Sequence, residues 1–130
     1  MAQVHARKLR ILAVDHNPLL REGLRVLFQL QPDMELVGLV ASGKEAVQAF
    51  TEHRPDITLM DLDLPGAEGL TALQEILKID PAACVLGSMT YEEDESCKHA
   101  LRVGAKSCIT KDRLNQDLVP LIRDCMLPRL

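Results

Sequence analysis

Acidic residues follow two of the short apolar segments of this chain, and a lysine follows a third. Asp15 follows LRILAV, Asp61 follows DITLM, and Lys111 follows KSCIT. An ionised carboxylate at the end of a buried segment is costly unless something pairs with its charge. Two close carboxylates are best stabilised by a hard divalent cation, and a lysine beside them suits a phosphoryl oxygen. If the three side chains meet, one carboxylate could attack phosphorus and hold an aspartyl phosphate.

The segments that must position these residues alternate between strand-like and helix-like patterns. Asn17 and Pro18 form an N-cap and a favourable first helical residue, and Ser42 with Glu45 has the form of a capping box. We expect strands over residues 9–14, 35–41, 56–60, 84–89 and 106–110. We expect helices over about 18–31, 43–53, 70–79, 92–103 and 115–126.

Strict alternation of strands and helices predicts an α/β fold, a parallel sheet with helices on both faces. Sites in such sheets lie outside the carboxyl ends of the strands, where the strand order reverses. In the order 2-1-3-4-5, this point lies between the first and third strands, which makes Asp15 and Asp61 neighbours. Lys111 would lie at the same edge. The fourth predicted strand ends there with Ser88, Met89 and Thr90.

The composition limits the remaining possibilities. The 130 residues are 47% hydrophobic and 26% charged, which fits a single domain over residues 1–130 with one core. The net charge of −4 gives no footprint for nucleic acid, and no signal peptide or membrane-spanning run is evident, so we expect a cytoplasmic protein. The four cysteines form no C-x-x-C pair and have no neighbouring histidine cluster, so we expect small buried thiols and not a zinc site or disulfides. They are Cys84, Cys97, Cys108 and Cys125.

Three ungapped segments resemble the receiver domain of two-component response regulators, in the NarL/FixJ-like branch: RILAVDHNPLLREGL, DITLMDLDLPGAEGL and ALRVGAKSCITKD. The resemblance covers about residues 8–126. It implies a flavodoxin-like (βα)5 fold and a regulatory protein, not an enzyme, that takes phosphate from a histidine kinase or phosphotransfer protein onto Asp61. It further implies Mg²⁺ held by Asp15, Asp61 and the backbone carbonyl of Asp63, with Lys111 contacting the phosphoryl group.

Three residues depart from the family pattern. His16 stands where a second acidic residue is usual, so we expect weak Mg²⁺ binding. Met89 stands where a Ser or Thr normally contacts the phosphoryl group, and its neighbours Ser88 and Thr90 are further candidates. Cys108 stands in the fifth strand where the family usually has an aromatic residue. In the family, this aromatic side chain moves together with the hydroxyl at the end of the fourth strand. His16 could also be a solvated loop residue or a ligand for a softer metal such as zinc or nickel.

These departures leave a second function open, a degenerate receiver that acts as a phosphorylation-independent interaction module. Two further alternatives fit less well. Asp61 and Asp63 have the D-x-D spacing of haloacid-dehalogenase-like phosphatases, but that motif follows the first strand, not the third. A flavin mononucleotide site needs a hydroxyl- and glycine-rich loop, whereas the loop here begins with a carboxylate.

The resemblance also suggests partners. We expect a histidine kinase as a partner. We also expect a homodimer that forms through the face of the fourth helix, fifth strand and fifth helix, which phosphorylation reshapes in the family. Most relatives in this branch carry a C-terminal helix-turn-helix DNA-binding domain. None is present in this sequence, which leaves open whether one is attached in the full-length protein. We expect no membrane contact.

Overall fold

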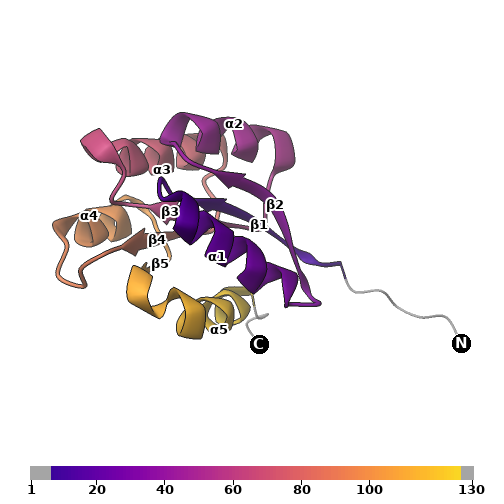
Figure 1. Cartoon of the computed structure of the whole chain (residues 1–130). Coiled ribbons are helices and arrows are strands. Elements are labelled where there is room, and N and C mark those ends of the chain that lie inside the picture. Colours follow the sequence, from indigo (N-terminus) through magenta and orange to yellow (C-terminus); the bar gives the residue numbers. More distant parts are fainter. Residues whose placement is uncertain (1–6, 127–130) are drawn as a thin grey trace, which may run out of the picture.

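The computed structural model describes residues 7–126, in which a five-stranded parallel sheet lies between two layers of helices (Figure 1). The strand order is β2-β1-β3-β4-β5, as predicted. The strands are β1 (Leu9–Val14), β2 (Met34–Val40), β3 (Ile57–Asp61), β4 (Val85–Met89) and β5 (Ser107–Thr110). The helices are α1 (Pro18–Gln29), α2 (Gly43–His53), α3 (Glu68–Ile79), α4 (Glu95–Val103) and α5 (Leu114–Met126), with short 3-10 turns η1 (Pro65–Ala67) and η2 (Lys111–Arg113).

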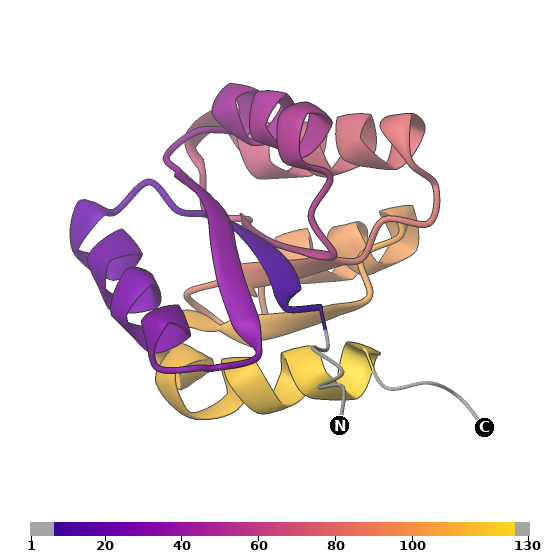
Figure 2. The ribbon, with the colours of Figure 1, turned by 90° about the vertical axis from the view of Figure 1, so that its right-hand side faces the viewer.

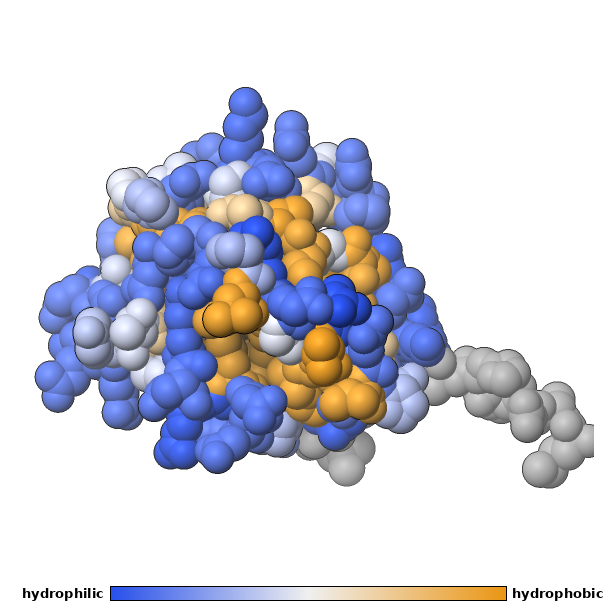
Figure 3. Space-filling view, viewed as in Figure 1, coloured by the Kyte–Doolittle hydropathy of each residue, from blue (hydrophilic) through white to orange (hydrophobic). Residues whose placement is uncertain are grey.

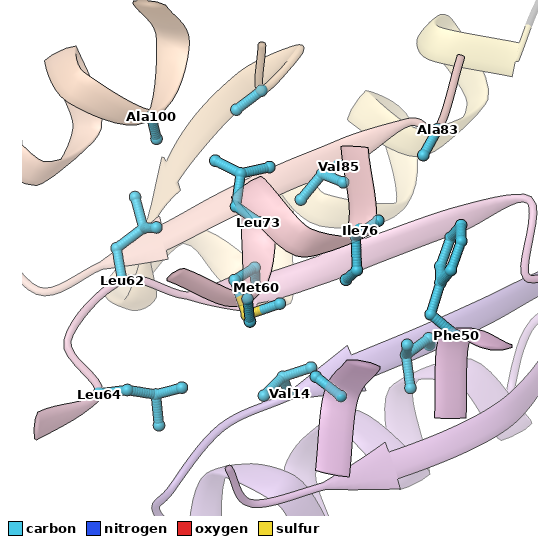
Figure 4. Close-up of a cluster of buried hydrophobic side chains, with 14 of the residues drawn as sticks. Val14, Phe50, Met60, Leu62, Leu64, Leu73, Ile76, Ala83, Val85 and Ala100 are labelled. Atoms are coloured by element: carbon cyan, nitrogen blue, oxygen red, sulfur yellow. The ribbon is translucent and has the colours of Figure 1, made fainter. Parts of the chain in front are cut away.

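The two faces of the sheet bury different side chains, because successive residues of a strand point to opposite sides. From β1, Leu12 and Val14 enter the core beneath α2, α3 and α4, which Figure 4 shows in close-up. Ile11 and Ala13 of the same strand enter a second core beneath α1 and α5. Figure 2 shows these two groups of helices on opposite sides of the sheet. The helices therefore hold the carboxyl ends of the strands in fixed positions.

Local side-chain contacts begin the helices nearest to the predicted site. Asn17 caps α1 by accepting a hydrogen bond from the backbone N–H of Leu19 at 2.9 Å. Ser42 caps α2 by accepting one from the Glu45 N–H at 3.2 Å, and its hydroxyl donates to the Glu45 carboxylate at 3.0 Å. Both predicted caps are therefore present.

Some element boundaries differ from the sequence prediction. The fourth helix begins at Glu95 and not at residue 92, because the Asp94 carboxylate caps it by accepting from the Ser96 N–H at 2.7 Å. The third helix begins earlier than predicted, at Glu68, directly after the turn η1. The fifth begins at Leu114, one residue early, after the turn η2. Strands β2 and β3 are each displaced by one residue, and β4 and β5 each begin one residue later than predicted. As a result, Asp61 is the last residue of β3 itself.

The surface seen in Figure 3 is largely hydrophilic, with apolar side chains exposed between the charged ones. Exposed large apolar side chains include Leu19 and Val26 of α1 and Leu30, the residue directly after this helix. Within residues 7–126, none of the helices has the length and apolar character needed to cross a bilayer.

Candidate functional site

The carboxyl ends of β1, β3 and β5 bring together the three residues that the sequence analysis singled out. Val14 pairs with Met60 in the parallel register of β1 and β3, so Asp15 emerges beside Asp61. Lys111 follows β5 and reaches across to both, with its Nζ 3.0 Å from Oδ2 of Asp15 and 2.9 Å from Oδ1 of Asp61. The predicted juxtaposition of two carboxylates and one lysine is therefore present.

Asp61 is completely buried, and both of its carboxylate oxygens have partners. Oδ1 accepts from the backbone N–H of Asp63 at 2.8 Å, in addition to facing Lys111. Oδ2 lies 2.7 Å from Nδ1 of His16 and accepts from the His16 backbone N–H at 3.3 Å. Burial by itself raises the pKa of this carboxyl, but the hydrogen bonds from His16, Lys111 and Asp63 outweigh it, so the pKa of Asp61 is lowered. Asp61 is therefore held as a carboxylate.

Asp15 has a different environment, although it is equally buried. Its Oδ1 accepts from the Asn17 N–H at 2.8 Å. Its Oδ2 faces the Lys111 ammonium at 3.0 Å but outside hydrogen-bond geometry, and this oxygen has no hydrogen-bond partner among the described residues. Burial would lower the pKa of Lys111, yet the nearby carboxylates of Asp61 and Asp15 raise it. The lysine is therefore held as a cation.

His16 contacts the Asp61 carboxylate and does not point away into solvent. Its side chain is 48% exposed, while one ring edge contacts Asp61. A carboxylate can only accept a hydrogen bond, so in this contact Nδ1 carries the proton. One ligand atom each from Asp15, His16 and Asp61 lies within 4.8 Å of the others, and this is the only such group of potential metal-binding side chains in residues 7–126.

Asp63 points its side chain at the end of β4, a contact that the sequence analysis did not identify. Its Oδ2 accepts from both the backbone N–H of Thr90 at 2.8 Å and the Thr90 hydroxyl at 2.6 Å. The same oxygen lies 3.7 Å from Nζ of Lys111. The D-x-D spacing places Asp63 near the site, but no feature of the sequence identifies Thr90 as its partner. The Thr90 hydroxyl is thus already engaged.

The other two candidates at the end of β4 make no hydrogen bond to the Asp61 carboxylate within residues 7–126. Ser88 is opposite Asp61 in the strand register, but its hydroxyl is buried and donates to the Met60 carbonyl at 3.5 Å. Met89 is 3% exposed and belongs to the core beneath α2, α3 and α4. Cys108, on β5, packs against that same core and donates from Sγ to the carbonyl of Cys97 on α4 at 3.8 Å.

The donor atoms at this edge fit a divalent cation in part. The unpartnered Asp15 Oδ2 is a buried carboxylate oxygen, the kind of ligand that Mg²⁺ accepts. The His16 imidazole against Asp61 is not, because nitrogen suits softer ions better than magnesium. The site therefore has the carboxylates that Mg²⁺ needs, with one donor of a different chemical class among them.

The sequence of this chain is similar to those of known proteins. Residues 11–123 match the family model described as the response regulator receiver domain. The chain is 34% identical over 116 residues to the oxygen regulatory protein NreC of Staphylococcus carnosus, covering 88% of this chain and 54% of NreC. It is 34% identical over 111 residues to the uncharacterised transcriptional regulatory protein YhcZ of Bacillus subtilis, covering 85% and 52%. The chain spans about half the length of these curated relatives.

Solved structures give the same result. A two-component response regulator of the LuxR family from Aurantimonas is 34% identical, with a TM-score of 0.84 over 91% of this chain and 84% of that one. The receiver domain of the putative regulator NarL from Mycobacterium tuberculosis is 28% identical, with a TM-score of 0.84 over 92% and 97%. Proteins of this kind are signalling proteins and not classical enzymes. With its flavodoxin-like sheet and its acidic edge, the chain belongs to the receiver domain family of response regulators, close to the NarL type.

Proposed function

We propose that this chain accepts a phosphoryl group on Asp61 from a histidine kinase or a phosphotransfer protein. One observation carries the proposal: the Asp61 carboxyl group is fully buried, and the Lys111 ammonium lies 2.9 Å from its Oδ1. If the end of β3 had only a structural role, an apolar residue would be expected there, because burial of an ionisable group is costly without a partner. The arrangement suits a nucleophile that has a cation beside it.

The residues of this chain can supply most of the transfer chemistry. An oxygen of Asp61 attacks the phosphorus of a phosphohistidine, and the phosphorus–nitrogen bond of the donor breaks as the new phosphorus–oxygen bond forms. Lys111 remains protonated, because its carboxylate neighbours raise its pKa, and its ammonium can contact the phosphoryl oxygens. A divalent cation such as Mg²⁺, held by Asp15, Asp61 and the Asp63 carbonyl, would neutralise negative charge on those oxygens.

Access to the acceptor depends on His16. Asp61 exposes no surface, so a donor can reach it only if a covering side chain moves. Lys111 is 14% exposed and is held by two carboxylates, whereas the His16 side chain is 48% exposed and has a single side-chain partner here. We therefore expect the His16 imidazole to move away from Asp61 when a phosphoryl donor binds.

The test is intact-mass analysis after incubation with acetyl phosphate or phosphoramidate in the presence of Mg²⁺. We expect one phosphoryl adduct on the natural sequence and none on Asp61→Asn. Asp112→Asn is the matched control, because Asp112 is an exposed carboxylate directly after Lys111 and should label normally. An adduct that survives Asp61→Asn, or the absence of any adduct with every donor, would contradict the proposal.

Two contacts favour a second candidate, an interaction module that does not respond to phosphate. Met89 is packed into the core, and the Thr90 hydroxyl is held by Asp63 at 2.6 Å, so neither is free to follow a phosphoryl group. A switch needs two states for which the ligand has different affinity. Here the face of α4, β5 and α5 would bind a second copy or a partner protein in one constant conformation.

Amide exchange distinguishes the two candidates. Beryllofluoride, a stable phosphate mimic, would be added with Mg²⁺ and exchange measured over residues 88–126. The interaction module predicts little change in protection and no change in oligomeric state. Large protection changes in α4 accompanied by a change in association would exclude it and support a working switch.

A further inference from the structure

We infer that Asp15, His16 and Asp61 form a site for a divalent transition-metal ion of the zinc class, with the His16 nitrogen as one ligand. The inference concerns the acceptor site of the proposed function but needs no phosphate chemistry. One ligand atom from each of the three residues lies within 4.8 Å of the other two. That spacing lets a single ion reach all three atoms with modest side-chain movement, given metal–ligand distances of about 2.0–2.2 Å.

A buried oxygen that has an ion-pair partner but no hydrogen bond within residues 7–126 points to a missing ligand. Asp15 is 1% exposed, and its Oδ2 has no hydrogen-bond partner among the described residues. Buried polar atoms nearly always have a partner, so such an oxygen needs an explanation. The nearby ammonium of Lys111 compensates its charge but does not donate to it along a hydrogen-bond direction. A metal ion would supply the missing contact.

The charge of the site favours an ion that binds by more than charge alone. The carboxylates of Asp15 and Asp61 bring two negative charges, and Lys111 between them offsets one. Mg²⁺ binds mainly through electrostatics to oxygen ligands in near-octahedral geometry, so it loses most from this offset. Zinc, cobalt and nickel form strong bonds to imidazole nitrogen and lose less. The same residues that weaken a magnesium site thus suit a transition metal.

His16 is already in position to act as a ligand. Its backbone N–H donates to Asp61 Oδ2 at 3.3 Å, and its Nδ1 lies 2.7 Å from the same oxygen. To bind the ion, Nδ1 would release its proton to solvent, and the neutral imidazole would carry its single proton on Nε2, which is exposed to exchange with solvent. The half-exposed ring has room for the small rotation this requires. Lys111 keeps its contact with the other Asp61 oxygen.

The test is calorimetric titration of tag-free, metal-stripped, reduced protein with Zn²⁺ and with Mg²⁺. Loss of a nitrogen ligand should weaken Zn²⁺ binding about 10-fold or more in His16→Ala and leave Mg²⁺ affinity nearly unchanged. His16→Asp should tighten Mg²⁺ and so reduce the preference for zinc. His99→Ala is the matched control, because His99 is exposed on α4 and should change neither affinity.

Two spectroscopic readouts identify the ligand without any activity measurement. The chain has four histidines, and Zn²⁺ should shift the ring nitrogen resonances of His16 far more than those of the others. Co²⁺ should give visible bands without the strong near-ultraviolet band of a cobalt–thiolate bond, which excludes the cysteines as the binding site. Circular dichroism verifies that each variant is folded.

The outcomes separate the inference from the proposed function. Zn²⁺ affinity that is equal in His16→Ala and the natural sequence would overturn the inference, as would an unmoved His16 ring resonance or a thiolate band. A protein that binds Zn²⁺ through His16 but accepts no phosphoryl group would contradict the proposed function alone. Asp15→Asn gives a second check, since the loss of the unpartnered oxygen should also weaken Zn²⁺.

Discussion

Replacement of Lys111 by methionine tests whether this lysine makes the acidic edge compatible with folding. Its Nζ lies 3.0 Å from Asp15 Oδ2 and 2.9 Å from Asp61 Oδ1, and both carboxylates are almost completely buried. Methionine keeps an apolar stem of similar length but removes the charge. Two buried carboxylates then face each other without a cation, which is the situation that makes a broken buried pair costly.

The expected loss of stability follows from that geometry. Removal of one partner from a buried ion pair typically costs about 3–5 kcal/mol. Lys111 is itself desolvated on folding and keeps 14% of its side chain exposed, both of which reduce what it contributes. We therefore expect Lys111→Met to lower the free energy of unfolding by about 2–4 kcal/mol at neutral pH, which is near or below the lower end of the typical cost.

Urea unfolding followed by circular dichroism, in buffer with EDTA, measures this loss. A double-mutant cycle with Asp61→Asn isolates the interaction, since Lys111→Met should cost less by about 1.5–3 kcal/mol once one carboxylate is neutral. Lys106→Met is the matched control, because Lys106 is exposed before the amino end of β5 and should change stability by less than about 0.5 kcal/mol.

Two results would refute the reasoning. One is a Lys111→Met protein that unfolds at the same urea concentration as the natural sequence. The other is a cost that is the same with and without Asp61→Asn. Either would mean that the lysine does not compensate the carboxylates in the folded protein.

Three further predictions concern other parts of the fold. Gly69→Ala should lower the melting temperature in a thermal scan, with a loss of about 1–3 kcal/mol, because a Cβ there would lie 2.2 Å from the Asp61 carbonyl oxygen; an unchanged melting temperature would contradict this. The Arg123 hydrogen bonds lower the pKa of Asp33, so they stabilise the fold above the ordinary pKa of about 3.9 and lose this effect as pH falls through the lowered value. Urea midpoints of Arg123→Gln and the natural sequence should accordingly differ at pH 7 and converge in acid; a constant difference argues against the pair. Burial raises the pKa of the Cys84 thiol to about 11, so iodoacetamide should modify it much more slowly at pH 8 in the folded than in the urea-unfolded protein, and equal rates by mass spectrometry would show it to be accessible.

The sequence was sufficient for the architecture because its signals are local and repeated. Alternating strand and helix patterns predicted a parallel sheet, and parallel strands place all their carboxyl ends at one edge. That rule was sufficient to predict from the sequence that Asp15, Asp61 and Lys111 lie close together. It failed at boundaries such as the start of α4, where Glu92, Glu93 and Asp94 are all acceptable near a helix start and the Asp94 contact with the Ser96 N–H decides between them.

The contacts within the site were decided only by the tertiary structure. His16 could be interpreted as a solvated loop residue until its ring was found 2.7 Å from Asp61 Oδ2, across 45 residues of sequence. Asp63 likewise meets Thr90 only because β3 and β4 are adjacent. Which carboxylate pairs with the lysine, the imidazole or the hydroxyl depends on distances and angles set by the packing of the sheet. Periodicity along the chain contains no information about these, because each partner comes from a different strand or loop.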